Sequence, residues 1–445
     1  MKLVKLLFIG VILMAAQACS SVTVRESEQF VRVKGTKFYL GEKPYYFAGT
    51  NLWYGCYLGS PGETGDRERL KRELDFLSEL GIKNLRICAA SEESAMGRSI
   101  KPAIHKSPGV YDEDLLIGLD FLLAEMKKRD MKGVLFINNY WQWTGGMAQY
   151  NQWFSDEKLP DPDNPKEGYG MFMDYSAKFY QNEKAMELFR KYVYDIVTRQ
   201  NKFTGEYYLN DPVIMAWQLA NEPRPGRDVV SKPYVDYFYK WVDETAKYIH
   251  SLDPNHLVTT GSEGMVGCIH DEEVFLKTHG SKYIDYVTMH LWAKNWGWFD
   301  ATKIDETYPR TESNAIDYFN QHMQLCRQLN KPITMEEFGM PRNNEEYAAG
   351  TPTNARDKYF EKLFEMVYDS AAAGAPIAGT NFWGWGGEGR PQNDEAIWNT
   401  GDPLTGDPPQ EPQGLNSIFN SDVSTLEILK KHAEAMKSLS ERKLP

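Results

Sequence analysis

The sequence predicts an α/β fold of the (β/α)8 TIM barrel type, and three observations support this. Eight apolar, strand-like runs occur along the chain, segments of helical periodicity separate them, and polar or aromatic residues stand where the strands end. Apolar runs that alternate with helices indicate a parallel sheet, and eight such units suit a closed barrel. A doubly wound open sheet is the alternative, but no G-x-G-x-x-G follows the first strand.

The strand candidates are short runs rich in β-branched or aromatic residues. A short hairpin that runs into the first strand is expected, because apolar and polar residues alternate around Lys34-Gly35. The eight candidates are residues 45–51, 84–88, 132–138, 213–223, 257–264, 286–292, 332–339 and 377–385.

The helices are predicted from apolar spacing. Leu70, Leu74, Leu77 and Leu80 recur at helical intervals, and Gly81 follows as a stop signal. The Pro/Gly-rich segment 386–414 has no such spacing and is expected to be a long loop. We see no linker and no repeat, so residues 30–440 are expected to form one domain. Further helices are expected over residues 116–126, 183–199, 233–252, 314–329, 354–373 and 422–438, with a weak one around 274–278.

Composition excludes one class of partner. The formal net charge of −12 would repel phosphate backbones, so nucleic acid is not expected as a ligand. The chain has 12 Trp and 26 Tyr, which is consistent either with an aromatic core or with exposed rings that stack on flat ligands.

The first residues resemble an export signal. Lys2 and Lys5 precede an apolar stretch over residues 6–16, and Ala16-Gln17-Ala18 then precedes Cys19. We therefore expect residues 1–18 to be a signal peptide and Cys19 to be the lipidated first residue of a bacterial lipoprotein of the outer membrane or periplasm, with plain secretion as the alternative. No later segment has the roughly 18 apolar residues of a membrane helix, so membrane contact is expected only through the lipid. A monomer is expected.

The remaining cysteines show no metal-binding spacing. Cys56, Cys88, Cys268 and Cys326 are far apart in sequence, and no zinc, haem or iron–sulfur pattern is present. No metal and no cofactor are expected, and the pairing of these cysteines stays open.

Four acidic residues stand at strand ends, where a barrel of this kind carries its catalytic groups: Glu222, Glu263, Glu336 and Glu337. Glu222 precedes Pro223, which ends the strand and directs the glutamate toward the barrel mouth. Glu336 and Glu337 end another strand, and neighbouring strand residues face opposite sides. Only one of the two is therefore expected to reach the mouth, and the other to face the helices or reach round to an ion pair. Alternation alone does not choose between them.

Several motifs give the chain a family resemblance. Residues 217–223 (WQLANEP) and 337–339 (EFG) look like the two signature strands of glycoside hydrolase family 5. The β-mannanase branch of that family is similar in five further stretches, and the resemblance covers about Phe30 to Leu439. These stretches are residues 49–51, 221–224, 290–296, 382–385 and 413–425.

The resemblance implies specific roles. Glu222 is expected to be the catalytic acid/base and Glu337 the nucleophile, which leaves Glu336 as a structural acid. Substrate contacts are implied for Arg86, Asn221, His290 and Trp383. Position at the same end of the barrel adds Trp53, Asn139, Arg224 and Trp292, the last at a place where the wider family usually has tyrosine. Loop tryptophans at this end are expected to form cleft walls: Trp141, Trp143, Trp296, Trp298 and Trp385.

The implied function is a retaining endo-β-1,4-mannanase. It would hydrolyse internal bonds of mannan, glucomannan or galactomannan, with Glu337 ionised at low pKa and Glu222 protonated. The alternatives are an exo-acting β-mannosidase, a mixed β-glucanase/mannanase, and a non-catalytic glycan-binding protein. Exo action is favoured if the long loops over residues 141–182 or 386–414 block one end of the cleft. The binding protein needs a lost carboxylate, and both are present.

Overall fold

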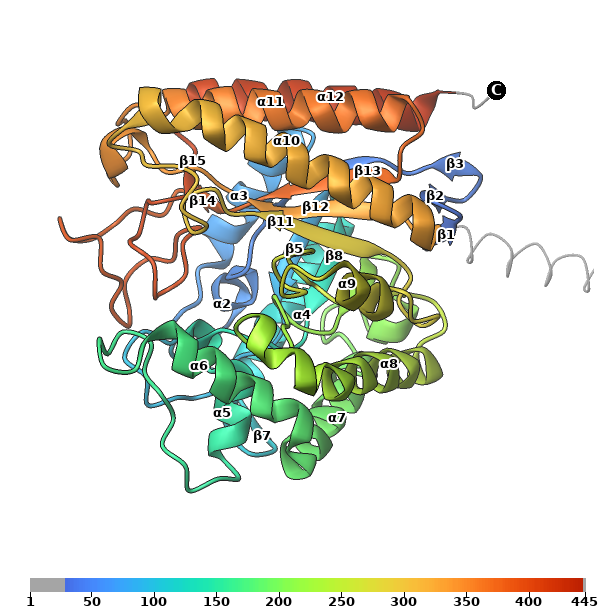
Figure 1. Cartoon of the computed structure of the whole chain (residues 1–445), viewed down its shortest axis with the longest axis vertical. Helices are drawn as coiled ribbons and strands as arrows, with labels where there is room; N and C mark the ends of the chain where they lie inside the picture. The colour runs from blue at the N-terminus through green and yellow to red at the C-terminus, as the bar shows by residue number, and fades with distance from the viewer. Residues whose placement is uncertain (1–28, 443–445) are drawn as a thin grey trace, which may run out of the picture.

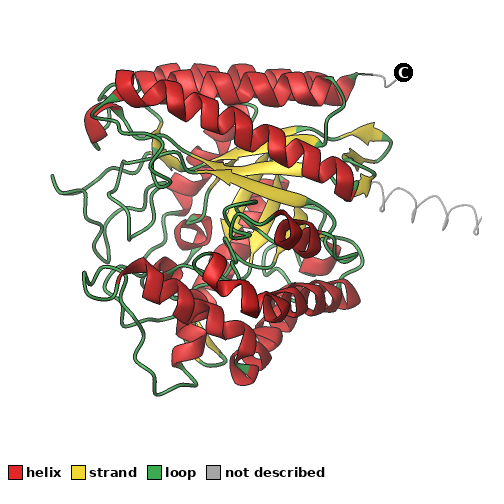
Figure 2. Ribbon diagram, in the orientation of Figure 1, coloured by secondary structure: helices red, strands yellow, loops and turns green. Residues whose placement is uncertain are grey.

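A computed structural model describes residues 29–442 of the chain. The predicted signal peptide and Cys19 lie outside the described residues. Helices surround a central sheet, and the three N-terminal strands lie at one end of it (Figures 1 and 2).

The central sheet is an eight-stranded parallel barrel. Its strand order is β10-β9-β8-β5-β4-β13-β12-β11. The two ends of this order meet at Thr259, the last residue of β10. Thr259 forms a bridge with Tyr286 before β11, and its Oγ1 donates to the Tyr286 carbonyl over 2.8 Å. The predicted TIM barrel is therefore confirmed. Its strands are β4 (Phe47–Asn51), β5 (Asn84–Cys88), β8 (Lys132–Phe136), β9 (Ile214–Gln218), β10 (Leu257–Thr259), β11 (Val287–Leu291), β12 (Ile333–Phe338) and β13 (Ile377–Phe382).

Eight helices form the outer layer of the barrel units. Helix α10 begins ten residues earlier than the spacing predicts. Pro309 interrupts the sequence signal there, but buried Tyr308 and Thr311 anchor the first turns and Asp305 and Glu306 favour the helix start. The helices are α3 (Arg67–Glu79), α4 (Glu113–Lys127), α7 (Glu183–Val197), α8 (Val235–Leu252), α9 (Glu272–His279), α10 (Ile304–Leu329), α11 (Asn354–Ala372) and α12 (Val423–Glu441).

The N-terminal hairpin covers the amino ends of the strands. Strands β1 (Val31–Lys34) and β2 (Lys37–Leu40) pair antiparallel, and β3 (Lys43–Pro44) extends the small sheet. Phe38 is buried edge-to-face on Tyr286, and Phe30 on His256, both beside the starts of barrel strands. This end of the barrel is thus closed by apolar packing, which leaves the opposite end for chemistry.

The opposite end carries the long loops. The loop after β8 contains α5 (Gly146–Gln152) and α6 (Gly168–Ala177), and the loop after β9 contains the 3-10 helix η4 (Val229–Tyr234). The Pro/Gly-rich segment is a loop, as expected. It is held at its base where β14 (Trp385–Gly387) pairs with β15 (Ile418–Phe419).

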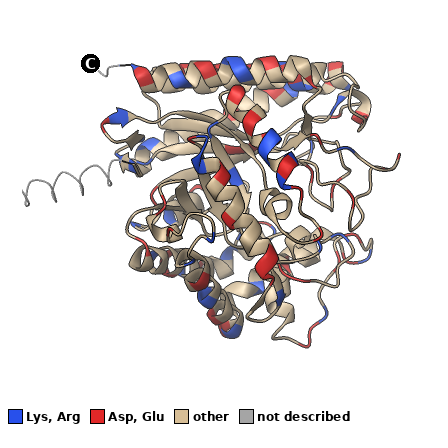
Figure 3. Cartoon of the chain, turned by 180° about the vertical axis from the view of Figure 1, so that it is seen from behind, with Lys and Arg blue, Asp and Glu red and all other residues tan. Residues whose placement is uncertain are grey.

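Charges of both signs are interspersed over the outer helices (Figure 3). The four described cysteines are buried and unpaired, which settles the pairing among them. Within residues 29–442, no helix combines the length and the apolar character of a membrane span.

Candidate active site

The carboxyl ends of β9, β11 and β12 bring two carboxylates and one imidazole together. His290 Nδ1 lies 2.6 Å from Glu222 Oε1 and 3.3 Å from Glu337 Oε2. One atom from each of the three side chains falls within 4.8 Å of the others, and all three residues are buried. Such a trio could hold a cation in principle. The positive charges of the Arg86 and Arg224 guanidinium groups beside the trio disfavour a bound cation.

Glu222 is held in an unusual backbone conformation. Its φ is +52°, in the left-handed region that costs a residue with a Cβ about 1–2 kcal/mol. Its N–H donates to the carbonyl of Gly261 over 2.9 Å. Gly261 itself has φ of +79°, and a Cβ there would lie 2.0 Å from the Ala220 carbonyl oxygen. The loop after β10 therefore fixes the direction of Glu222 and requires glycine to do so.

Arg86 is the fully buried hub beneath the carboxylates. Its guanidinium bonds to Glu337 Oε1, and its Nη2 donates to Asn221 Oδ1 over 2.7 Å. Asn221 Nδ2 donates in turn to Asn139 Oδ1 over 3.1 Å. Four of the predicted residues are thus one connected network. Two residues absent from the predicted set complete it, namely Gln218 and Asn51, at 2.8 and 3.0 Å from the guanidinium.

Both adjacent glutamates of β12 face this hub, which simple alternation does not allow. Met289 pairs with Met335, but the next residue, His290, pairs with Glu337, so Glu336 is an extra residue in β12. This bulge lets Glu336 reach Arg86, with Nε and Oε2 3.5 Å apart, while Glu337 also contacts it. Of the two possibilities expected for Glu336, a position toward the helices or an ion pair, the structure shows the ion pair.

The electrostatics make the two catalytic candidates unequal. Burial raises the pKa of Glu222, and Arg224 and the Trp141 indole oppose that rise. Burial, and then repulsion from Glu222, raise the pKa of Glu337 against the pull of Arg86, so the expected low pKa of Glu337 is wrong. Because Arg86 contacts Glu337 directly, we place the first negative charge of the pair on Glu337 and the remaining proton on Glu222.

His290 cannot supply a full positive charge to either carboxylate. Burial and the charge of Arg86 lower its pKa well below the ordinary histidine value, so the ring is neutral near pH 7. Its role is that of a hydrogen-bond partner between the two carboxyls.

Four tryptophans surround the carboxylates. The indole N–H of Trp292, at the place where the wider family usually has tyrosine, donates to Glu337 Oε2 over 3.1 Å. The indole N–H of Trp141 donates to Glu222 Oε2 over 2.5 Å. Trp383 and Trp143 line the same pocket, and the buried indole N–H of Trp383 has no partner in the described chain. The indole of Trp383 is thus available to a ligand.

Of the other predicted tryptophans, only Trp296 lines the pocket within the described residues. Trp53 is fully buried, with its N–H on the Gly406 carbonyl and its ring against Trp143, so it supports the pocket wall and is not on its surface. Trp298 does not line the pocket, and the buried indole N–H of Trp385 in β14 donates to Glu73 of α3.

The pocket has a volume of about 590 Å³ and contains two further acids, for which no role was predicted from the sequence. Glu263, after β10, accepts from Arg224 Nε over 2.5 Å, and burial raises its pKa to about 7. Glu411 comes from the loop after β14. Burial raises its pKa to about 8, and its Oε2 has no partner within the described residues. Glu263 stands at a strand end, which identified it as a candidate without a role, whereas Glu411 has no local signal in the sequence.

Comparison with known proteins decides the family. A family model described as GH family 5 beta-mannosidase-like matches residues 28–441. The chain belongs to glycoside hydrolase family 5. It is therefore a glycoside hydrolase, and the resemblance in its motifs is confirmed.

Relatives of this hydrolase are similar over most of their length. Mannan endo-1,4-beta-mannosidase 7 of Arabidopsis thaliana is 30% identical over 80% of this chain and 77% of its own. A crystal structure of a family 5 mannosidase from Rhizomucor miehei is 34% identical, with a TM-score of 0.86 over 93% of this chain and 99% of that one. An endo-beta-1,4-mannanase from Thermotoga petrophila, at 23% identity and a TM-score of 0.63 over 90% and 78%, shares the fold.

Proposed function

We propose that this hydrolase is a retaining endo-β-1,4-mannanase with Glu337 as nucleophile and Glu222 as acid/base. The observation that carries the proposal is the approach of these two carboxyls to one neutral imidazole in a pocket at the carboxyl end of the barrel. Retaining glycosidases hold their two carboxyl groups about 5–5.5 Å apart, whereas inverting ones need room for a water between them.

The proposed chemistry follows from the unequal charges. The Glu337 carboxylate attacks the anomeric carbon as the glycosidic C–O bond breaks, and Glu222 gives its proton to the departing oxygen. The ester that forms removes the charge of Glu337, so the pKa of Glu222 falls and Glu222 can take a proton from water. That water then attacks the anomeric carbon and releases Glu337. Asn221, fixed by Arg86 and Asn139, is placed to bond the sugar 2-hydroxyl.

The relatives support a mannan substrate. The Arabidopsis protein is named for mannan endo-hydrolysis, and a variant of the Rhizomucor mannosidase has been solved with mannosyl-fructose. We therefore propose β-mannan or manno-oligosaccharides as the substrate. Trp383 would lie under the sugar at the cleavage point, since its ring packs against C–H faces and its N–H is free to donate.

An exo-acting β-mannosidase is the second candidate, and the loops favour it. Both long loops line the pocket, the first through Trp141, Tyr169 and Met173 and the second through residues 408–415. The second loop is rigid, because the Asp407 carboxylate accepts from the N–H groups of Gly414, Asn416 and Ser417. It carries the unpartnered carboxyl of Glu411 into the pocket, where it could bind the terminal hydroxyls of a chain.

The products formed from mannohexaose separate the two candidates. An endo enzyme releases mannobiose, mannotriose and longer oligomers together from the first minutes. An exo enzyme releases one product only. Glu337→Ala protein serves as the control and should be inactive while its melting temperature is retained. Hydrolysis at the wild-type rate by that variant would remove the assignment.

We also propose that the protein is exported and anchored through Cys19, and that it acts as a monomer. The proposal rests on the residue pattern of the first 19 positions. Labelling of cells with radioactive palmitate should mark the wild-type protein and not Cys19→Ala. Label in both proteins would exclude this anchor.

A further inference from the structure

A groove outside the catalytic pocket lies between the loops after β8 and β9. Its volume is about 940 Å³, and its walls come from α6, the chain that follows it, η4 and the first turn of α8. Rings from three elements line it, namely Phe154, Tyr234 and Tyr237. We call it the side groove.

Exposed apolar side chains concentrate around this groove. Thirteen large apolar residues are exposed in the described chain, and seven of them lie on two short segments, residues 154–171 and 229–237. Tyr234 and Tyr237 are 54% and 48% exposed. Four of the seven line the groove itself, namely Phe154, Val230, Tyr234 and Tyr237, and exposed apolar side chains that gather in one place mark a binding site more often than isolated ones do.

The groove also offers hydrogen-bonding groups that are not engaged. Within residues 29–442, the side chains of Gln181 and Lys184 and the hydroxyls of Tyr234 and Tyr237 make no hydrogen bond or ion pair with the protein. Flat rings together with free amide, hydroxyl and ammonium groups suit a sugar, which has C–H faces and a rim of hydroxyls. A purely apolar partner would not use these polar groups.

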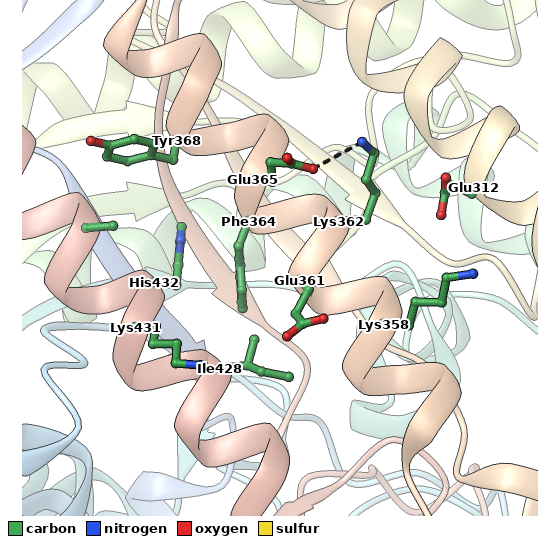
Figure 4. A pocket seen from close by; sticks show the side chains of 11 residues that line it. Glu312, Lys358, Glu361, Lys362, Phe364, Glu365, Tyr368, Ile428, Lys431 and His432 are labelled. Atoms are coloured by element: carbon green, nitrogen blue, oxygen red, sulfur yellow. Dashed lines mark hydrogen bonds and ion pairs between the residues drawn. The ribbon is translucent and has the colours of Figure 1, made fainter.

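A second cavity shows the contrast. The cavity of about 560 Å³ between α11 and α12 is lined mainly by Lys and Glu side chains of the outer helices, some of them paired with each other (Figure 4). Of its rings, Phe364 and His432 are buried and Tyr368 is half-buried, and the cavity lies in the outer helical layer. Mixed, self-paired charges of this kind are ordinary helix surface.

The side groove lies next to the catalytic pocket, on the side of Glu222, and neighbouring residues of α6 and of the loop after β9 line the one and the other. The general acid protonates the leaving group, so the leaving sugars lie beside Glu222. Arg224 marks that side, with its guanidinium 5.0 Å from the Trp141 ring. The next two residues, Pro225 and Gly226, already line the side groove. Likewise Met173 of α6 lines the pocket, and its neighbour Asp174 lines the groove.

We propose that the side groove binds the sugars of a β-1,4-linked mannan chain beyond the leaving-group residue, with Tyr234 and Tyr237 as stacking platforms. The proposal rests on the function proposed above and deepens it. The Arg227–Asp174 ion pair, at 3.5 Å and half-exposed, joins the loop after β9 to α6, and Asp174 lines the groove. Short substrates fill only the pocket. Longer ones gain contacts in the groove.

The test compares ligand length. Calorimetry on protein made inactive by Glu222→Ala measures binding of mannobiose and of mannohexaose, with and without Tyr234→Ala/Tyr237→Ala. The double change should raise the Kd of mannohexaose by about tenfold, since each lost ring contact is worth about threefold, and should leave mannobiose unchanged. Tyr194→Ala, an equally exposed ring on α7, is the matched control and should change neither Kd.

The outcomes are distinct. Equal Kd values for mannohexaose with and without the two tyrosines overturn the groove proposal. Equal weakening of both ligands also overturns it, because the change would then act on the pocket. If the protein binds neither oligosaccharide and the wild type hydrolyses neither, the proposed function itself fails. A monomer–dimer shift on loss of the tyrosines, with unchanged sugar binding, would assign the groove to self-association instead.

Discussion

The indole N–H of Trp141 provides a test of how the pKa of Glu222 is set. Trp141→Phe removes the donor that lies 2.5 Å from Glu222 Oε2 and retains a ring under Arg224. A hydrogen bond to a charged group is worth about 1.5–3 kcal/mol, and one pKa unit corresponds to about 1.4 kcal/mol. The N–H stabilises the carboxylate, so its loss raises the pKa of Glu222 by about one to two units.

The assay is the pH dependence of kcat/KM on a soluble manno-oligosaccharide. Glu222 must be protonated to act as the acid, so activity is lost as the pH rises through its pKa. The alkaline limb should therefore move to higher pH by about one to two units. Trp143→Phe, which lines the same pocket and makes no bond to Glu222, should leave the limb in place. A limb that stays or moves to lower pH in Trp141→Phe would refute this reasoning.

Three further changes have directions fixed by the contacts. Trp292→Phe removes a donor from Glu337, so the pKa of Glu337 should rise and the acid limb of kcat/KM move up by about one unit; an unchanged acid limb would contradict the assignment of charge to Glu337. Glu263→Gln leaves the charge of Arg224 unbalanced beside Glu222, so the alkaline limb should move down by about one unit, and an upward shift would count against it. Burial raises the pKa of Glu92 to about 8 from an ordinary 4.5. The folded state therefore holds the proton that the unfolded state loses, and the free energy of unfolding falls as pH rises between these values, by up to about 5 kcal/mol. Glu92→Gln should thus raise Tm at pH 8 and leave it nearly unchanged at pH 4.5, and equal Tm values at pH 8 would show that Glu92 is not buried uncharged.

The barrel could be predicted from the sequence because its signals are local. An apolar run such as residues 132–138 indicates a buried strand, and leucines at helical spacing, as in residues 70–80, indicate a helix with one buried face. The start of α10 could not be predicted in this way, because Pro309 removes the helix signal and tertiary burial of Tyr308 restores the helix.

Those site residues that lie near strand ends could be predicted from the sequence. Arg86 lies within β5, and the other predicted residues lie at or just beyond the carboxyl ends of their strands, where the barrel brings them together: Asn139, Asn221, Glu222, His290 and Glu337. The side chain of Glu336 depends on a one-residue register shift against β11, which no local pattern reveals. The position of Glu411 depends on the folding of a long loop around Asp407, and the burial of Trp53 depends on its packing against Trp143. These positions are set by contacts between distant segments.

The most direct measurement of the central claim is the configuration of the first product. Proton NMR during the first minutes of mannohexaose hydrolysis reports the anomer that forms before mutarotation. Double displacement through Glu337 predicts that the β-anomer appears first and then equilibrates. Initial appearance of the α-anomer would contradict the account, because it requires a single displacement by water and no covalent bond to Glu337.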